Sequence, residues 1–348
     1  MNKVAFITGI TGQDGTYLSE LLLKKGYSVW GMVRRASNSG AIARIKKLTD
    51  GRVNLRYGDM TDPVSIRKIL TECKPDEVYN LAAQSHVRVS FDVPEYTAKV
   101  NAVGVVDLLD AITSIVPEAR FYQASTSEMF GHSTPPQDEN TSFKPCSPYG
   151  SAKLHAYWHV KNIRDSFSLF ASNGILFNHE SERRGLNFVT RKITSTVAKI
   201  KLGIENKLSL GNLDAKRDWG HAEDYVRAMY LMLQHDVPDD YVISTGKANT
   251  VRSFLENTLK CAGIKFIVSH DSSKPEDPVG IQYINEDNGN IIVDIDPRFY
   301  RPVEVNYLCG KPDRARDILG WETIISFENL IERMYKNDFD IYSSGLGD

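Results

Sequence analysis

The sequence predicts an α/β fold built on a doubly wound parallel sheet, followed by a second, smaller domain. In the first half of the chain, short apolar runs that suit buried strands alternate with amphipathic segments that suit helices. A glycine-rich turn follows the first run, and 348 residues are enough for one large core and a smaller one. Six such runs predict six parallel strands with helices on both faces.

The first strand is expected at Val4–Ile7, and the glycine-rich turn Thr8–Gly15 follows it directly. Glycines at positions 9, 12 and 15 permit a tight turn, a close approach of backbone to a pyrophosphate, and close packing of helix on strand. Glycine spacing alone is a weak signal. Its place at the first strand–helix junction nevertheless predicts a Rossmann-type dinucleotide site.

The second strand is expected at Ser28–Val33, and the residues at its end bear on the choice of cofactor. An NAD-preferring site places an acidic side chain there to bind the ribose 2′-hydroxyl. This chain has Arg34 and Arg35 instead. Because two guanidinium groups suit a 2′-phosphate, we expect NADP. The alternative is that both arginines are ordinary solvated surface residues.

The third and fourth strands, expected at Val53–Tyr57 and Glu77–Ala83, bring polar residues to the same edge of the sheet. After the third strand, Asp59 could accept a hydrogen bond from an adenine amino group with Met60 packed on the ring, or it could cap the next helix. The small residues of the fourth strand would let its backbone approach the cofactor. Gln84–His86 follow at its carboxyl end, where open α/β sheets bind ligands.

A long helix is expected from Tyr96 to Val116, and a fifth strand at Phe121–Ala124 delivers Thr126 and Glu128 at its carboxyl end. A sixth strand is expected to begin at Leu169.

Between these last two strands, Ser147–Lys153 indicates the start of a helix, because Pro148 suits the first helical position. Tyr149 and Lys153 are four residues apart and share one face of that helix. An ammonium group near a phenol favours the phenolate, so we expect the pKa of Tyr149 to fall toward neutral, as suits a general base for a hydroxyl. The alternative is that the pair only lines a helix surface.

The second half of the chain is richer in polar and basic clusters. A polar loop is expected at 177–185, then a helix with Arg191 and Lys192, and further basic clusters at 216–221 and 301–304. Each cluster could be ordinary surface charge. Several of them downstream of a dinucleotide fold indicate a phosphorylated substrate.

Composition argues against several classes of protein. Lys and Arg (42) nearly balance Asp and Glu (44), which gives no support to binding of nucleic acid or an anionic membrane. No apolar run approaches the ~18 residues of a membrane span, and the apolar start at Val4–Ile7 is too short for a signal-peptide core. The four cysteines form no CxxC pair and no metal-ligand spacing is present, so free thiols in the cytoplasm are expected. An exposed loop is expected from Asp271 to Asn290, and a disordered tail from Ser343.

The glycine turn and the Tyr149–Lys153 pair resemble the extended short-chain dehydrogenase/reductase superfamily. Within it, the chain is similar over nearly its whole length to the GDP-mannose 4,6-dehydratases. The stretches that carry this closer resemblance are Thr8–Gly15, Gln123–Glu128, Gly174–Ser181, Gly211–His221, Arg301–Val305 and Leu319–Trp321.

The resemblance implies a role for each site residue. The implied catalytic set is Thr126, Glu128, Tyr149 and Lys153. NADP contacts are implied for Gly9, Ile10, Thr11, Gly12, Gln13, Asp14, Arg34, Asp59, Met60, Leu81, Ala82, Ala83, Gln84, Ser85, Tyr96, Lys153, His179 and Arg184. Contacts with the substrate GDP-mannose are implied for Ser85, Asn178, Lys192, Arg217, Arg301 and Glu304, and no metal ion is implied.

The resemblance also implies the reaction and the architecture. GDP-mannose would become GDP-4-keto-6-deoxymannose plus water, by oxidation at C4, elimination across C5 and C6, and hydride return to C6 on bound NADP. A Rossmann domain is implied at 1–177, with 213–245 returning to it. A smaller, discontinuous C-terminal substrate domain is implied at 178–212 and 246–340, with a tail at 341–348. A homodimer or homotetramer is expected, in which the 35–44 loop reaches a neighbouring subunit's cofactor site.

Three alternatives stay open. A sugar-nucleotide 4-epimerase would share Tyr149 and Lys153 but has no need of the Glu128 carboxylate. A thymidine-linked glucose dehydratase would share the chemistry, but resembles Thr-Asp-Glu where this chain has Thr126-Ser127-Glu128. A regulatory NADP-sensing protein would have little reason to keep the four catalytic residues together.

The chain also departs from the family pattern. Glu182 stands where proline is expected, Leu186 stands where glutamate is expected, and one residue is missing between Thr126 and Tyr149. These departures leave the chemistry intact and bear on the loop that joins the two ligand sites.

Overall fold

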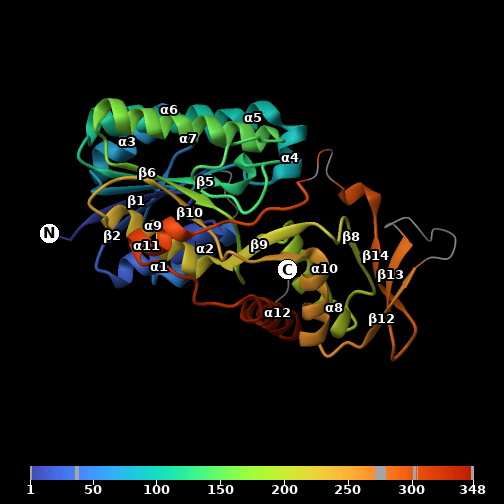
Figure 1. Cartoon of the computed structure of the whole chain (residues 1–348). Helices are drawn as coiled ribbons and strands as arrows, with labels where there is room; N and C mark the ends of the chain where they lie inside the picture. The colour runs from blue at the N-terminus through green and yellow to red at the C-terminus, as the bar shows by residue number, and fades with distance from the viewer. Residues whose placement is uncertain (1, 36–38, 271–279, 301–302, 304, 346–348) are drawn as a thin grey trace.

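The computed structural model describes residues 2–35, 39–270, 280–300, 303 and 305–345, and it is built around one large parallel sheet (Figure 1). The seven strands of this sheet lie in the order β10-β6-β5-β4-β1-β2-β3, and every neighbouring pair is parallel. The strands are β1 (Val4–Thr8), β2 (Ser28–Val33), β3 (Asn54–Tyr57), β4 (Glu77–Asn80), β5 (Arg120–Thr126), β6 (Ala171–Leu176) and β10 (Asp240–Ile243). The strand order reverses between β1 and β4, so the predicted doubly wound α/β fold is confirmed.

Helices cover both faces of this sheet. In Figure 1, α3, α6 and α7 lie on one face, and α1 and α9 lie on the other with α11 beside them. The helical segments of this part are α1 (Gln13–Lys24), α2 (Ser39–Leu48), α3 (Pro63–Cys73), α4 (Val87–Asp92), α5 (Pro94–Ala98), the π-helix η1 (Lys99–Val103), α6 (Gly104–Ile115), the 3₁₀ turn η2 (Ser127–Met129), α7 (Pro148–Phe167), α9 (Ala222–Gln234) and α11 (Asp313–Leu319). Apolar side chains pack against both faces of the sheet, and together they form what we call the large core.

A second core lies in the C-terminal part of the chain. A four-stranded sheet, β12 (Phe266–His270), β13 (Ile281–Asn285), β14 (Ile291–Ile295) and β8 (Leu208–Leu210), packs with α8 (Val189–Lys201), α10 (Val251–Cys261) and α12 (Phe327–Ser343). A short 3₁₀ turn, η4 (Pro297–Phe299), follows β14. A three-stranded sheet, β11 (Ala248–Thr250), β9 (Lys216–His221) and β7 (Asn178–Glu180), lies between the two parts (Figure 1).

The chain crosses between the two cores more than once. Within 213–245, α9 and β10 pack with the large sheet, whereas Leu213, Ala215 and Trp219 belong to the second core. Residues 313–321 were expected in the smaller domain, but Ala315 and Trp321 pack into the core beside α9. The last helix, α12, continues to Ser343, so it runs into the segment expected to be a tail.

Three local expectations were wrong, and a fourth needs one refinement. The strand expected at Glu77–Ala83 ends at Asn80, because beyond it the backbone N–H groups of Leu81 and Ala82 donate to the Thr8 hydroxyl (3.1 Å each). The loop expected at 177–185 contains strand β7, which pairs with β9. The loop expected at 271–290 contains β13, whose alternate residues Ile281 and Tyr283 are buried; residues 271–279 lie outside the described part. The long helix expected at 96–116 is confirmed as a continuous helical stretch from Pro94 to Ile115, in which the π-helix η1 lies between α5 and α6.

Candidate active site

The glycine turn connects β1 to α1 at the carboxyl edge of the large sheet. Gly9 has φ +70°, and a Cβ there would lie 2.8 Å from the Ala82 nitrogen. A Cβ on Gly15 would lie 2.5 Å from the Gly9 carbonyl oxygen, so only glycine allows α1 to start this close to β1. Gly12 is the N-cap of α1 and has no side chain to cap its first N–H groups. This turn therefore presents backbone donors and a helix N-terminus, as a pyrophosphate site requires.

Asp14 and His179 form an ion pair beside this turn. The His179 Nε2 lies 2.8 Å from Asp14 Oδ2, and Nδ1 lies 2.8 Å from the Phe177 carbonyl oxygen. Burial favours the neutral imidazole, but the Asp14 carboxylate outweighs it and raises the pKa of His179 above its ordinary value. Both ring nitrogens then donate. Two residues expected at the cofactor site from distant parts of the chain are thus in direct contact.

Gln13 gives the same segment a second attachment. Its Nε2 donates to the His179 carbonyl oxygen (3.0 Å), and its Oε1 accepts from the Ser181 hydroxyl (2.8 Å). The segment after β6 is therefore tied to the start of α1. Ile10, which precedes Gln13 in the turn, is fully buried.

Arg34 follows β2, and its guanidinium donates to the Tyr96 hydroxyl (2.7 Å). Two residues expected to contact NADP thus contact each other. Asp59 accepts from the backbone N–H and hydroxyl of Thr61 (2.9 Å each), and the cap of the next helix, the alternative duty considered for Asp59, is Asp62.

Of the remaining residues in this group, Met60 is buried under Gly104, where a Cβ would lie 2.4 Å from the Met60 carbonyl oxygen. Ala83 is half-buried in the loop after β4. In that loop, Gln84 donates through its backbone N–H to Asn101 (2.9 Å), and Ser85 is exposed.

The four expected catalytic residues meet at the carboxyl end of β5 and the start of α7. Thr126 ends β5 and caps η2, which carries Glu128, and α7 begins at Pro148 as predicted. The side chains of Thr126 and Tyr149 are hydrogen-bonded to each other. The Lys153 ammonium donates to the Ala124 carbonyl oxygen (2.8 Å), and its Nζ lies 6.0 Å from the centre of the Tyr149 ring.

The expected lowering of the Tyr149 pKa is not found. Burial raises the pKa of Tyr149 to about 12, the Glu128 carboxylate adds to this, and the hydrogen bond with Thr126 offsets only part of it. Burial also lowers the pKa of Lys153 to about 8. The expectation counted the charge of the ammonium but not the desolvation of the phenol, which outweighs it.

The two basic residues expected at the substrate that the structure describes lie on two elements. Lys192 on α8 donates to the Ser209 carbonyl oxygen (2.7 Å), and its Nζ lies 3.4 Å from the centre of the Phe299 ring. Arg217 on β9 is buried, and its guanidinium donates to the Lys216 carbonyl oxygen (3.0 Å).

Of the other residues expected at the ligands, two lie in the described part of the chain and two lie outside it. Asn178 on β7 pairs in register with Trp219 of β9. Arg184 lies 2.9 Å from Glu180 and stacks on Phe188. Arg301 and Glu304 lie outside the described residues.

Arg44 closes the segment 35–44 that was expected to be a loop reaching a neighbouring subunit, but it lies in helix α2 and contacts its own chain. Its guanidinium donates to the Thr11 carbonyl oxygen of the glycine turn (2.8 Å). This contact was not expected from the sequence, because Arg44 is thirty-three positions away from Thr11.

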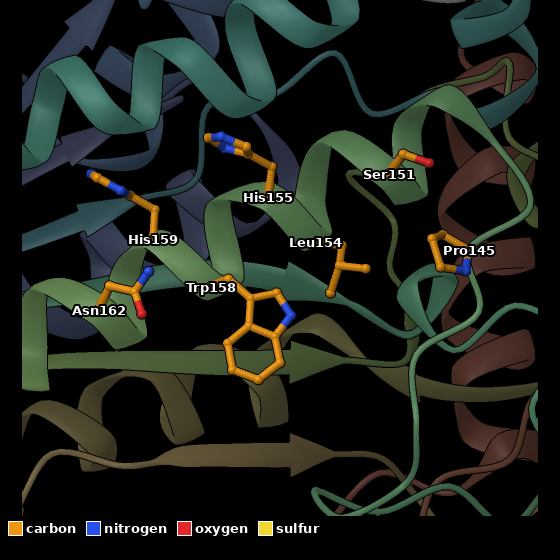
Figure 2. A pocket seen from close by; sticks show the side chains of 7 residues that line it. All are labelled: Pro145, Ser151, Leu154, His155, Trp158, His159 and Asn162. Atoms are coloured by element: carbon orange, nitrogen blue, oxygen red, sulfur yellow. The ribbon is translucent and has the colours of Figure 1, made fainter.

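A hollow on the outer face of α7 is separate from this site. It has a volume of about 420 Å³ and contains none of the residues expected to act (Figure 2). It is lined by Pro145, Ser151, Leu154, His155, Trp158, His159 and Asn162. By helical period these α7 positions lie opposite Tyr149 and Lys153.

Comparison with known proteins gives the family. A family model described as GDP-mannose 4,6 dehydratase matches residues 6–334. The chain belongs to the GDP-mannose 4,6-dehydratase family. The GDP-mannose 4,6 dehydratases of Cricetulus griseus and Homo sapiens are each 52% identical to it over 348 residues, covering 97% of this chain and 92% of each relative.

Solved structures agree on the fold. A UDP-glucose 4-epimerase from Thermus thermophilus, solved in complex with NAD, superposes with a TM-score of 0.79 over 96% of this chain and 98% of that one. Its identity is 20%, so this likeness shows the fold alone.

Glu182 and Leu186, the two residues expected to depart from the family pattern, are four positions apart in the chain. Leu186 is exposed, whereas the Glu182 carboxylate is in contact with three donors from other elements. Sequence reasoning missed those contacts, and it also missed Ser90, whose buried hydroxyl accepts from the Tyr149 backbone N–H (3.2 Å). Such partners lie far apart in the chain and leave no local pattern.

The cysteines at 73, 146, 261 and 309 are free thiols. Within the described residues, no helix is both long and apolar enough to cross a membrane. Nor does the described part of the chain bring three or more His, Cys, Asp or Glu side chains together in a way that would hold a metal ion.

Proposed function

We propose that this member of the family converts GDP-mannose to GDP-4-keto-6-deoxymannose with loss of water, on a bound NADP. The observation that carries the proposal is the meeting of Thr126, Glu128 and Tyr149 at one end of the sheet, all three buried to more than nine-tenths. A phenol and a carboxylate together supply one base for a hydroxyl and one for a carbon acid.

The residues present fit the dinucleotide. The close contacts that a Cβ would make at Gly9 and Gly15 keep a backbone cradle open at the start of α1. The Arg34 guanidinium at the end of β2 suits a 2′-phosphate, which supports NADP over NAD. When bound in its oxidised form, NADP would supply a hydride acceptor for C4 of the sugar and, once reduced, a hydride donor for C6, so the net reaction would be redox-neutral.

Tyr149 takes the proton of the sugar 4-hydroxyl, and Thr126 orients that oxygen through a hydrogen bond. The phenol hydroxyl is a poor base while burial holds its pKa at about 12. The positive charge of Lys153, held on the same face of α7, favours the phenolate. Lys153 is itself oriented by its hydrogen bond to the Ala124 carbonyl oxygen.

Glu128 performs the elimination. Once C4 is a ketone, the C5 hydrogen is acidic, and the Glu128 carboxylate removes it as a proton. The resulting carboxylic acid then protonates the departing 6-hydroxyl, which leaves as water, and the carboxylate is regenerated. A proton finally returns to C5. Because an epimerase needs no C5 base, a buried carboxylate at this position favours the dehydratase over that alternative.

The diphosphate of the substrate is assigned to the basic residues of the second part of the chain. Lys192 and Arg217 supply positive charge from α8 and β9, and Asn178 supplies an amide from β7. Holding the nucleotide there fixes the sugar over Tyr149 through the whole sequence of steps.

Incubation of the purified protein with GDP-mannose and NADP⁺, followed by NMR and mass spectrometry, tests the proposal. We expect a product lighter by one water, with a 4-keto group and a C6 methyl group. A product of unchanged mass and altered C4 stereochemistry would identify an epimerase instead. Full recovery of GDP-mannose with NADP⁺ still bound would favour a sensing role.

A further inference from the structure

The Glu182 carboxylate joins three separate elements. Its Oε2 accepts from the Tyr17 hydroxyl of α1 (2.8 Å) and from Nε2 of His221 at the end of β9 (3.3 Å). Its Oε1 accepts from Nε of Arg333 on α12 (2.7 Å). The side chain is mostly buried, with 18% exposed. Glu182 therefore bridges the large core to the last helix of the second core.

The hydrogen bonds define which partner donates and which accepts. His221 accepts from the Glu223 backbone N–H through Nδ1 (3.1 Å), which leaves Nε2 as the ring nitrogen that donates to Glu182. Burial raises the pKa of Glu182, but the hydrogen bonds from His221, its own backbone, Tyr17 and Arg333 together hold it well below its ordinary value. The cluster is thus one carboxylate that accepts from a guanidinium, an imidazole and a phenol.

The backbone at this position is fixed as well. The Glu182 carbonyl oxygen accepts a hydrogen bond from Nη1 of Arg191, which also donates to the Arg184 carbonyl oxygen (3.1 Å). Nε of Arg191 donates to both oxygens of the buried Asp338 on α12 (2.7 and 2.9 Å). Helix α12 therefore reaches this segment directly through Arg333 and indirectly through Asp338, which holds Arg191.

The neighbours of Glu182 in the segment 179–184 contact the glycine turn and α1. His179 pairs with Asp14, and Ser181 donates to Gln13. The Arg183 guanidinium lies 3.8 Å from the centre of the Tyr17 ring and pairs with Glu20 (2.8 Å). The segment is thus attached to the dinucleotide turn on one side and to α12 on the other.

We propose that Glu182 is a positioning residue for the dinucleotide: by holding the segment 179–184 between α1 and α12, it keeps Gln13, Asp14 and His179 in place beside the glycine turn. Glu182 acts through these residues and does not itself contact the ligand. The inference rests on the proposed function, because it assigns the dinucleotide to that turn.

The test uses Glu182→Ala and Glu182→Gln, with Glu223→Gln as a matched control. Glu223 is the second carboxylate on Arg333, at 3.0 Å, so the control loses an ion pair with α12 but keeps every contact of Glu182. Glu182→Gln keeps the length and one acceptor oxygen but loses the charge. The measurements are the NADP⁺ dissociation constant by calorimetry, the thermal midpoint, and the kcat and KM for each ligand.

Glu182→Ala is expected to raise the dissociation constant of NADP⁺ about tenfold or more, because Asp14 and Gln13 lose their fixed partners. The NADP⁺ dissociation constant of Glu182→Gln should lie between those of Glu182→Ala and the wild type. At saturating NADP⁺, kcat should stay within about threefold of the wild type, because the residues that move protons are untouched. Glu223→Gln should lower the thermal midpoint without changing NADP⁺ affinity.

Two results would overturn the inference. One is a folded Glu182 variant whose NADP⁺ affinity stays within twofold of the wild type; Glu182→Gln decides this if Glu182→Ala does not fold. The other is an equal loss of affinity in Glu223→Gln, which would make general anchoring of α12 the cause. Failure of the wild type itself to bind any nicotinamide dinucleotide would instead overturn the proposed function.

Discussion

Tyr149 and Glu128 lie at the same end of the sheet, and in the proposed reaction they act on different hydrogens, so their variants should fail differently. Tyr149→Phe should stop the reaction before any oxidation. Glu128→Gln should still allow oxidation at C4, giving in a single turnover a 4-keto sugar that keeps its 6-hydroxyl. Elimination should fall by ~10²–10⁴-fold, the usual contribution of a positioned acid–base group. Rapid quench followed by mass spectrometry of the sugar nucleotide distinguishes the two.

Ser125→Ala serves as a control, because its hydroxyl is buried in the same strand and bonds to Asn173 (3.2 Å) rather than to the catalytic group. Normal turnover by Glu128→Gln would show that another group removes the C5 proton.

Arg34 is the residue on which the choice of NADP over NAD rests. Arg34→Ala should weaken NADP⁺ by about 1.5–3 kcal/mol, roughly tenfold or more, because a charged 2′-phosphate is left unpaired. NAD⁺, which lacks that phosphate, should be nearly unaffected. Tyr96→Phe is the control, since it removes the hydroxyl that Arg34 contacts but keeps the guanidinium. Equal weakening of both dinucleotides would mean that Arg34 does not bind the 2′ group.

Lys153 makes stability depend on pH in a defined direction. Its pKa falls from 10.5 to about 8 on burial. Between these values the unfolded chain binds more protons at this position than the folded chain, so stability rises with pH. Relative to Lys153→Met, the wild type should gain about 2 kcal/mol in free energy of unfolding from pH 8 to pH 9.5. Urea titrations of both proteins at each pH measure the difference in unfolding free energy. A difference that does not change with pH would contradict the lowered pKa of Lys153.

At the scale of single elements, β9 carries a buried carboxylate that joins two loops. Asp218 accepts from the Thr245 backbone and hydroxyl (2.8 and 2.6 Å) and from the Gly246 and Gly310 N–H groups (2.9 and 3.3 Å). Asp218→Asn should destabilise the protein by about 1–3 kcal/mol, because the NH2 group of the asparagine side chain would face some of these N–H and O–H donors. Asp214→Asn, at a largely exposed ion pair with Arg252, should cost only about 0–1 kcal/mol in the same urea titration. Equal losses of unfolding free energy in the two variants would mean that Asp218 does not hold the two loops together.

How well an element could be predicted depends on how local its determinants are. The strands β1 and β2 are largely buried apolar runs next to glycine, and the sequence places them to within a residue. Strand β7 was taken for a loop because its polar residues gain strand structure only by pairing with β9. Strand β13 does carry alternating apolar residues, but the polar, Pro-, Gly- and Asn-containing sequence around it was given more weight. The register of such strands is set by pairing and not by a local pattern.

The candidate site likewise contains features that a local sequence pattern predicts and features that it does not. Tyr149 and Lys153 were predicted to share a helix face because the spacing of four residues guarantees it. The pKa of Tyr149 was predicted in the wrong direction, since the extent of its burial depends on packing that no local pattern records. The contacts of Glu182 with Tyr17 and Arg333 span more than 150 positions and were likewise out of reach.

At the scale of the whole molecule, the proposed function gives the large sheet and the C-terminal core separate duties. The carboxyl edge of the sheet carries the glycine turn and the residues proposed to transfer protons, while α8 and β9 carry the basic residues assigned to the diphosphate. Segments that cross between the cores, such as 179–184, tie these duties together. The proposed reaction therefore requires one sugar nucleotide to stay bound from the oxidation at C4 until the hydride has returned to C6.

The most direct test of that claim follows a hydrogen through the reaction. GDP-mannose carrying deuterium at C4 should give a 4-keto-6-deoxy product with deuterium at C6 of the same sugar, and C5 should take up a solvent hydrogen. Mixing labelled and unlabelled substrate should give no exchange of the C4 label between molecules, as mass spectrometry can show. Loss of the label to solvent, or its scrambling between molecules, would contradict the internal oxidation, elimination and reduction proposed for this site.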